Sequence, residues 1–169
     1  ITNHLDLPVH FHPEYELSFI ENGKGLKRII GDCLEETGNL SLALIGPNLA
    51  HGWETYKCNH TGIHEISLHF QNDLFGDHFL GLRVMSPIKG MLEQSNRGIA
   101  FSGTTAQQLS PKIKNLSKAT GIRYILELIA ILHELATSKN KRLLSNPQNL
   151  KNSKENKLAL VTHYLKHHY

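Results

Sequence analysis

The sequence predicts a mainly β domain that continues into helices. Up to about residue 70, short segments rich in aliphatic and aromatic residues are separated by turn signals containing glycine, asparagine or proline. Short strands at such near-regular spacing are typical of an antiparallel barrel or sandwich. Beyond Phe70 the pattern changes to a helical period, most clearly over residues 122–136. We therefore expect a β unit first and a helical extension after it.

Six segments of the first region have the composition and the boundaries of strands. The clearest runs from Tyr15 to Glu21 and ends at an Asn-Gly dipeptide, which is typical of hairpin turns. Another apolar run is broken by the sequence Gly-Pro-Asn. We predict strands over residues 15–21, 26–30, 33–37, 40–45, 51–56 and 63–70.

The second region contains three predicted helices. Residues 87–94 form the first, and a short returning strand over residues 98–101 follows it. The second covers residues 104–119, where Pro111 either kinks the helix or divides it into two pieces, with Ser110 capping the second piece. The third covers residues 122–136 and has the strongest helical pattern in the chain.

This third helix has two apolar stripes, whereas a helix with a single burial partner needs only one. The first stripe consists of Ile122, Ile125, Ile129, Leu132 and Ala136. The second consists of Tyr124, Leu128, Ile131 and Leu135. We predict that one stripe packs on the β unit and that the second forms a homodimer contact. The alternative is a helix buried on both sides within its own domain.

The composition is that of an ordinary globular domain in a reducing compartment. The chain has 169 residues, 40% of them hydrophobic, and a formal net charge of +3. So small a charge neither requires nor excludes a nucleic-acid partner. Cys33 and Cys58 are the only cysteines and form no CxxC pair. No signal peptide is evident, and no run approaches the roughly 18 apolar residues of a membrane span, so we expect a cytoplasmic protein.

The C-terminal part has the features of a linker followed by the beginning of another unit. Residues 139–157 are rich in Lys, Asn and Ser, as linkers are. Residues 158–169 place apolar side chains on one side of a short amphipathic helix. Because this pattern is still helical at Tyr169 and the chain begins at Ile1, we expect a piece of a longer protein.

One segment carries a set of metal-ligating residue types. In an extended chain, His10, His12, Glu14 and Glu16 alternate onto one face, provided that Pro13 does not break the register. Two imidazoles and a carboxylate on one face suit a divalent ion such as Zn, Mn, Ni or Fe(II). A neighbouring strand could supply a fourth ligand, His51. The same groups could instead hydrogen-bond a metal-free ligand or serve structure alone.

The spacing H-x-H-x3-E-x6-G, from His10 to Gly23, resembles the first motif of the cupin family. The resemblance implies a jelly-roll barrel in which His10, His12 and Glu16, rather than Glu14, are ligands. The second cupin motif is matched more loosely over residues 38–51.

In that second motif His51 occupies the ligand position, while Gly46 and Asn48 stand where the family has proline and glycine. Trp53 shares strand parity with His51, so it is either a stacking surface for a sugar or an ordinary core residue.

A narrower resemblance covers nearly the whole chain. The segments HFHPEYEL, LALIGPNLAHGWE and ILELIAILHELA resemble the sensing and dimerisation domain of bacterial transcription regulators of the AraC/XylS type. Residues 158–169 resemble the opening helix of their double helix-turn-helix domain. The resemblance divides the chain into a sensor barrel (1–103), a helical dimerisation region (104–138), a linker (139–157) and the start of a DNA-binding domain (158–169).

The resemblance implies a non-enzymatic protein that binds a small, often sugar-like, effector in the barrel through His10, His12, Glu16, His51 and Trp53. It also implies a homodimer that binds DNA through a C-terminal domain missing from this chain. The alternatives are a metal-dependent cupin enzyme of the isomerase or dioxygenase type, and a non-catalytic binding or storage cupin.

Overall fold

The central strand β2 (Tyr15–Glu21) contributes to two different cores. Its five inner residues are all buried, as expected of a strand covered on both faces. Leu17 and Phe19 face one side and pack among the helices, whereas Ile20 faces the other side and packs against a second sheet. Alternation along one strand therefore divides the molecule into layers.

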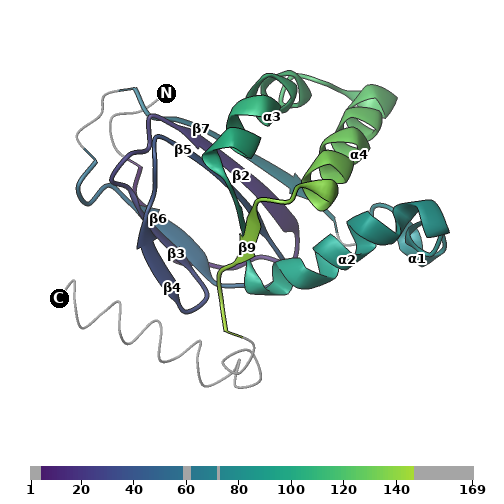
Figure 1. Cartoon of the computed structure of the whole chain (residues 1–169), viewed down its shortest axis with the longest axis horizontal. Helices are drawn as coiled ribbons and strands as arrows, with labels where there is room; N and C mark the ends of the chain where they lie inside the picture. Colours follow the sequence, from purple (N-terminus) through teal and green to yellow (C-terminus); the bar gives the residue numbers. More distant parts are fainter. Residues whose placement is uncertain (1–4, 59–61, 72, 147–169) are drawn as a thin grey trace.

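The computed structural model describes residues 5–58, 62–71 and 73–146, and within them the strands form two antiparallel sheets (Figure 1). The four-stranded sheet has the order β1-β6-β3-β4, with bounds Leu7–His10, His51–Glu54, Lys27–Ile30 and Cys33–Glu36. The five-stranded sheet has the order β7-β2-β5-β8-β9, its other members being His64–Phe70, Leu40–Ile45, Ile99–Phe101 and Lys141–Leu143.

The predicted mainly β fold with a helical extension is confirmed. The strands predicted over residues 15–21 and 40–45 coincide with β2 and β5. The two sheets of the described residues are not joined into a closed barrel, because neither edge of one sheet pairs with an edge of the other. They face each other across an apolar cluster that includes Ile20, Ile30 and Trp53.

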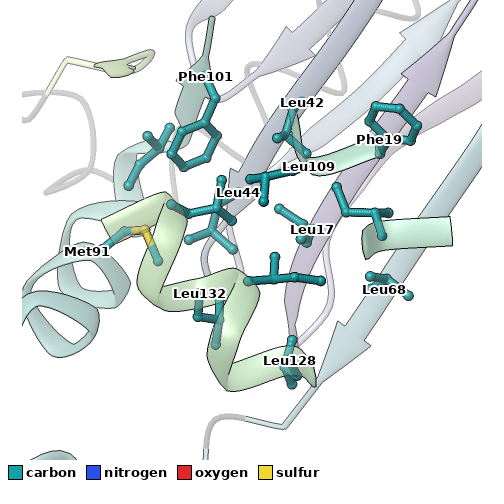
Figure 2. Close-up of a cluster of buried hydrophobic side chains, with 14 of the residues drawn as sticks. Leu17, Phe19, Leu42, Leu44, Leu68, Met91, Phe101, Leu109, Leu128 and Leu132 are labelled. Carbon is teal, nitrogen blue, oxygen red and sulfur yellow. The ribbon is translucent and has the colours of Figure 1, made fainter. Parts of the chain in front are cut away.

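Helices cover the outer face of the five-stranded sheet. These are α2 (Ser86–Gln94), α3 (Gly103–Leu116) and α4 (Gly121–Thr137), with two 3-10 turns at Arg83–Met85 and Ser95–Arg97, while the short α1 (Gly76–Leu80) contacts α2. Figure 2 shows Leu128 and Leu132 of α4 beside Leu17, Leu44 and Leu68 of the sheet, all in one buried cluster. The predicted sensor barrel and helical region thus share a core.

The structure of α3 decides two predictions, the effect of Pro111 and the role of Ser110. Helix α3 is a single helix with Pro111 inside it, and Ser102 caps its start by accepting a hydrogen bond from the backbone N–H of Thr105 (3.2 Å). Ser110 caps no second piece; its hydroxyl donates to the Glu21 carboxylate of β2 (3.2 Å).

Within the described residues, no helix combines the length and the apolar character that crossing a membrane requires.

The stripe of α4 that the sequence assigns to dimerisation lies mostly in the chain's own core. Leu128, Ile131 and Leu135 are at most 1% exposed, and Tyr124 is partly buried. The stripe faces the sheet because it is buried in the same apolar cluster as Leu17 of β2 and Leu44 of β5. The large exposed apolar residues of α4 are instead Ile122 and Leu126.

The first residues of the predicted linker belong to the five-stranded sheet. Strand β9 pairs antiparallel with β8, and the backbone N–H of Ser145 donates to the carbonyl of Arg97 (2.8 Å). Backbone pairing at a sheet edge places few demands on side-chain composition, so a polar stretch can add a strand. The rest of the predicted linker and the predicted DNA-binding helix (158–169) lie outside the described residues.

An ion pair between Glu21 and Lys114 joins the helical layer to the sheet. The carboxylate of Glu21 accepts hydrogen bonds from Lys114 (2.8 Å) and Ser110 of α3 and lies 3.2 Å from His64. Burial alone would raise the pKa of Glu21, but the hydrogen bonds from Lys114 and His64 lower it overall.

We expect Glu21→Gln to lower the free energy of unfolding by about 0.5–1 kcal/mol at about pH 7. A carboxyl group whose pKa is depressed in the folded state stabilises the fold above its unfolded pKa of about 4.3. The difference from wild type should therefore vanish as the pH falls through the folded-state pKa. Urea denaturation across this range measures it, with Glu127→Gln on the exposed side of α4 as the control. An effect of equal size at about pH 3 would contradict the assignment.

Candidate metal centre

The four predicted ligands come together where the two sheets meet. His10 ends β1 and lies opposite His51, the first residue of β6, in the four-stranded sheet. Glu16 lies in β2 of the other sheet, and His12 in the connection between β1 and β2. The group therefore depends on the face-to-face packing of the sheets.

Glu14 and Glu16 have different surroundings in the structure, although the alternating pattern places both on one face. Residues 11–14 are not in a strand, as expected where Pro13 interrupts pairing. The Glu14 carboxylate accepts a hydrogen bond from the side-chain amide of Gln71 (3.3 Å) and lies 3.5 Å from Nδ1 of His12, not beside the Nε2 atom that faces Glu16. The Glu16 side chain is 3% exposed and lies among the histidines. This placement agrees with the cupin resemblance, which assigns the ligand role to Glu16.

A single oxygen of Glu16 is the centre of the group. Its Oε2 atom lies 3.0 Å from Nε2 of His12, 3.1 Å from Nε2 of His51 and 3.2 Å from Nε2 of His69. The other oxygen, Oε1, accepts a hydrogen bond from the hydroxyl of Ser67 (2.8 Å). Ser67 thereby orients the carboxylate so that Oε2 faces the imidazoles.

Backbone carbonyls determine which nitrogen of each predicted histidine ligand is protonated. Nδ1 lies 2.8 Å from the Pro8 carbonyl in His10, 3.2 Å from the Glu14 carbonyl in His12 and 2.7 Å from the Leu49 carbonyl in His51. Because a carbonyl oxygen only accepts, each Nδ1 carries the proton. In the neutral imidazole, Nε2 is then a bare lone pair, the form that binds metals.

The contacts at Glu16 consequently require positive charge. Burial alone would raise the pKa of Glu16, but the hydrogen bond and charge of His51, with hydrogen bonds from Ser67 and His12, lower it to about 2. The carboxylate is therefore ionised near neutral pH. That lowering requires His12 and His51 to donate through Nε2, whereas in the neutral imidazoles the same Nε2 atoms are lone pairs that an ionised oxygen at 3.0–3.1 Å repels. Either the imidazoles take a second proton or a metal cation lies among these atoms.

The donor geometry fits a divalent metal ion. The ligand atoms of His10, His12, Glu16 and His51 all lie within 4.8 Å of one another. Two donors bound at about 2.1 Å and at right angles lie about 3 Å apart, and two opposite donors about 4.2 Å apart, so the most distant donors of this group move slightly closer when an ion binds. Three nitrogens and one oxygen suit Zn, Ni, Mn or Fe(II), as the sequence predicts.

Asn48, within the loosely matched second motif, has a left-handed backbone conformation and contacts the loop that carries His12. Asn48, which stands where the cupin motif has glycine, adopts a positive φ of 59°. Asparagine is among the residues that tolerate this left-handed conformation. Its backbone N–H donates to the carbonyl of His12 (2.8 Å) and so holds the loop that carries this ligand.

The sequence reasoning missed two residues of the site, Ser67 and His69. Both lie on β7, whose pairing with β2 places His69 opposite Glu16 and Ser67 opposite Ser18. Alternation along residues 63–70 indicates that they share a face, but which strand they adjoin is a tertiary fact. The side chain of His69 is 47% exposed and lines an open pocket of about 420 Å³ together with His12.

Trp53 lies beside this group inside the core. It is 1% exposed, and its ring lies 5.8 Å from that of His51 in an edge-on arrangement. Of the two roles that the sequence allows for Trp53, this position is that of a core residue. Its indole N–H has no hydrogen-bond partner among the described residues.

The comparisons with known proteins supply no family for the chain. No protein-family model, no curated protein and no solved structure matches it.

Proposed function

We propose that this chain is the effector-sensing and dimerisation domain of a bacterial AraC-type transcription regulator, with a divalent metal ion as part of its ligand site. The metal is held by His10, His12, Glu16 and His51, and an effector reaches it from the pocket beside His12 and His69. The two sheets correspond in this proposal to a cupin-type jelly roll. The regulator assignment rests on the sequence resemblance.

One observation carries the metal site. The nitrogens of His12 and His51 that face the Glu16 oxygen are the ones that carry no proton when the imidazoles are neutral, because their Nδ1 atoms donate to backbone carbonyls. A metal ion turns this mutual repulsion into coordination, because each of these atoms can then share a lone pair with the same cation.

A metal titration tests the site. Metal-stripped protein is titrated with Zn²⁺, Ni²⁺, Mn²⁺ and Fe²⁺ by calorimetry, the last under anaerobic conditions. We expect one ion per chain and a higher thermal midpoint in its presence, because an ion that binds only the folded state stabilises it. Absence of binding by all four ions would indicate doubly protonated imidazoles and a metal-free polar pocket.

The dimer contact of the proposal lies on the exposed side of α4. Ile122 is 74% exposed and Leu126 is 61% exposed, one helical turn apart. We expect the double substitution Ile122→Glu and Leu126→Glu to convert a dimer into a monomer, because a charge buried at an interface is strongly unfavourable.

Sedimentation velocity over a range of protein concentrations measures this change. Val84→Glu, at an equally exposed apolar residue outside α4, is the control and should leave the dimer intact. A wild-type chain that remains monomeric at high concentration would contradict the dimer contact.

The regulatory role needs the complete gene product. We expect it to bind DNA upstream of its own gene or of a neighbouring gene, with an affinity that changes when the metal or an effector is added. Footprinting with metal-stripped and metal-loaded protein measures this change. A coding frame without helix-turn-helix patterns beyond Tyr169 would remove the DNA-binding role and make a metal-dependent enzyme the leading interpretation.

A further inference from the structure

A second polar pocket lies apart from the candidate metal centre and shares no residue with it. It has a volume of about 1060 Å³ and lies between strands β4, β5, β8 and β9 and the first turn of α3. This volume accommodates a small organic molecule. Four cationic and two acidic side chains line it: Arg28, Lys139, Lys141, Arg142, Glu35 and Glu36.

The positive charges of this pocket exceed the negative charges available to them. The two oxygens of Glu35 each accept a hydrogen bond from a different guanidinium, those of Arg28 and Arg142. One carboxylate therefore serves two cations. Glu36 is paired with Lys57 (2.9 Å), which does not line the pocket. An anion in the pocket would compensate the remaining charge.

Arg28 is a buried cation of this pocket. It is 6% exposed, and beyond Glu35 it donates to the hydroxyl of Ser41 (3.0 Å). Its Nε–H has no hydrogen-bond partner among the described residues. A buried donor without an acceptor costs about 1–3 kcal/mol, so this arginine has donor capacity that the protein itself does not use.

The first turn of α3 adds backbone donors on the same side of the pocket. Ser102 caps the amide of Thr105, while Gly103 and Thr104 precede it and line the pocket. Amides of a first helical turn lack an intrahelical acceptor and carry the positive end of the helix dipole. The space beside the Cα atom of Gly103 is open, with no atom within 4 Å of the point that a Cβ atom would occupy. Anions are stabilised at such a position.

We infer that this pocket binds a small organic anion, whose phosphate or carboxylate group lies between Arg142, Arg28 and the first turn of α3. Guanidinium groups match both anions with paired N–H donors. Glu35 holds the arginines in place when the pocket is empty. Thr104, Gln107 and Asn140 also line the pocket and suit hydroxyl groups on the rest of the ligand.

The probes are inorganic phosphate and malonate, added to metal-stripped protein at constant ionic strength. Metal-stripped protein keeps anion binding independent of the proposed metal site, so either proposal can fail alone. Two-dimensional ¹H–¹⁵N NMR follows the Arg28 Nε–H signal and the amide signals of Gly103 and Thr104. We expect saturable shifts of these signals with a Kd on the order of 1 mM for at least one probe. A response to only one probe identifies the anion as phosphate or carboxylate.

Two variants change the affinity in opposite directions. Arg142→Gln should weaken binding about tenfold or more, because it removes a charged donor. Glu35→Gln should strengthen it several-fold, because it removes the carboxylate that competes for both arginines. Arg123→Gln, which removes an exposed arginine that is also paired with a glutamate, is the control and should change nothing.

The outcomes separate a ligand site from a purely structural cluster. If Arg28, Glu35 and Arg142 serve structure alone, Glu35→Gln destabilises the fold without any gain in anion affinity. That result would overturn the inference, as would shifts that never saturate or that are spread equally over the surface.

Discussion

Replacement of His51 by alanine is expected to weaken divalent-metal binding on the order of a thousandfold. His51 is 1% exposed and holds its Nε2 atom 3.1 Å from the Glu16 oxygen, so its loss removes a preorganised ligand. Loss of a partner in the outer shell of a metal site already costs about 10–100-fold, and loss of a ligand costs more. Competition with a chromophoric chelator measures the affinity, and Glu16→Gln should have an effect of the same order.

Two histidines of β7 serve as graded controls for this experiment. His64 contacts Glu21, outside the metal site, so His64→Ala should leave metal affinity unchanged. His69→Ala should retain affinity within about tenfold, because the four predicted ligands remain. It should also change the visible spectrum of bound Co²⁺ if His69 contacts the ion. Metal binding by His51→Ala with wild-type affinity would refute the assigned ligand set.

Leu128→Ala is expected to lower the free energy of unfolding by about 2–5 kcal/mol. Leu128 is fully buried in the cluster between α4 and the five-stranded sheet, so its truncation leaves a cavity in a close-packed interior. Leu126 is on the same helix and 61% exposed, and Leu126→Ala should change stability by less than about 0.5 kcal/mol. Urea denaturation of both variants at low protein concentration measures the difference.

The same pair of variants tests which face of α4 meets the sheet. If Leu128 belonged to a dimer contact, its truncation would weaken association and leave the stability of the dilute chain nearly unchanged. Comparable losses of stability in both variants would contradict the orientation of the helix in Figure 2.

Much of the fold could be predicted from the chain itself because local rules decide it. Strands β2 and β5 have their predicted bounds, since each is an apolar run stopped by turn residues. Helix α4 follows from its helical period. The short strand β9 falls within the predicted linker, because at a sheet edge the hydrogen bonds come from the backbone and the side chains are free to be polar.

Only those residues of the candidate site that follow from spacing along the chain could be predicted. His10, His12, Glu16 and His51 follow from their positions in the chain, and the structure brings all four together. The choice between Glu14 and Glu16 comes from family resemblance, since alternation treats them alike. Ser67 and His69 could not be predicted, because no local pattern says that β7 pairs with β2.

By itself, the sequence determined which side chains are available to the candidate metal centre. It also determined the alternation of side chains that divides β2 between two cores. Tertiary structure alone decided which faces meet. It buried Leu128 against the sheet and left Leu126 outside, and it placed Arg142 beside Arg28, which lies far from it in the chain. The physical reason is that periodicity is a property of neighbours along the chain. Burial and charge compensation depend instead on what packs against each face.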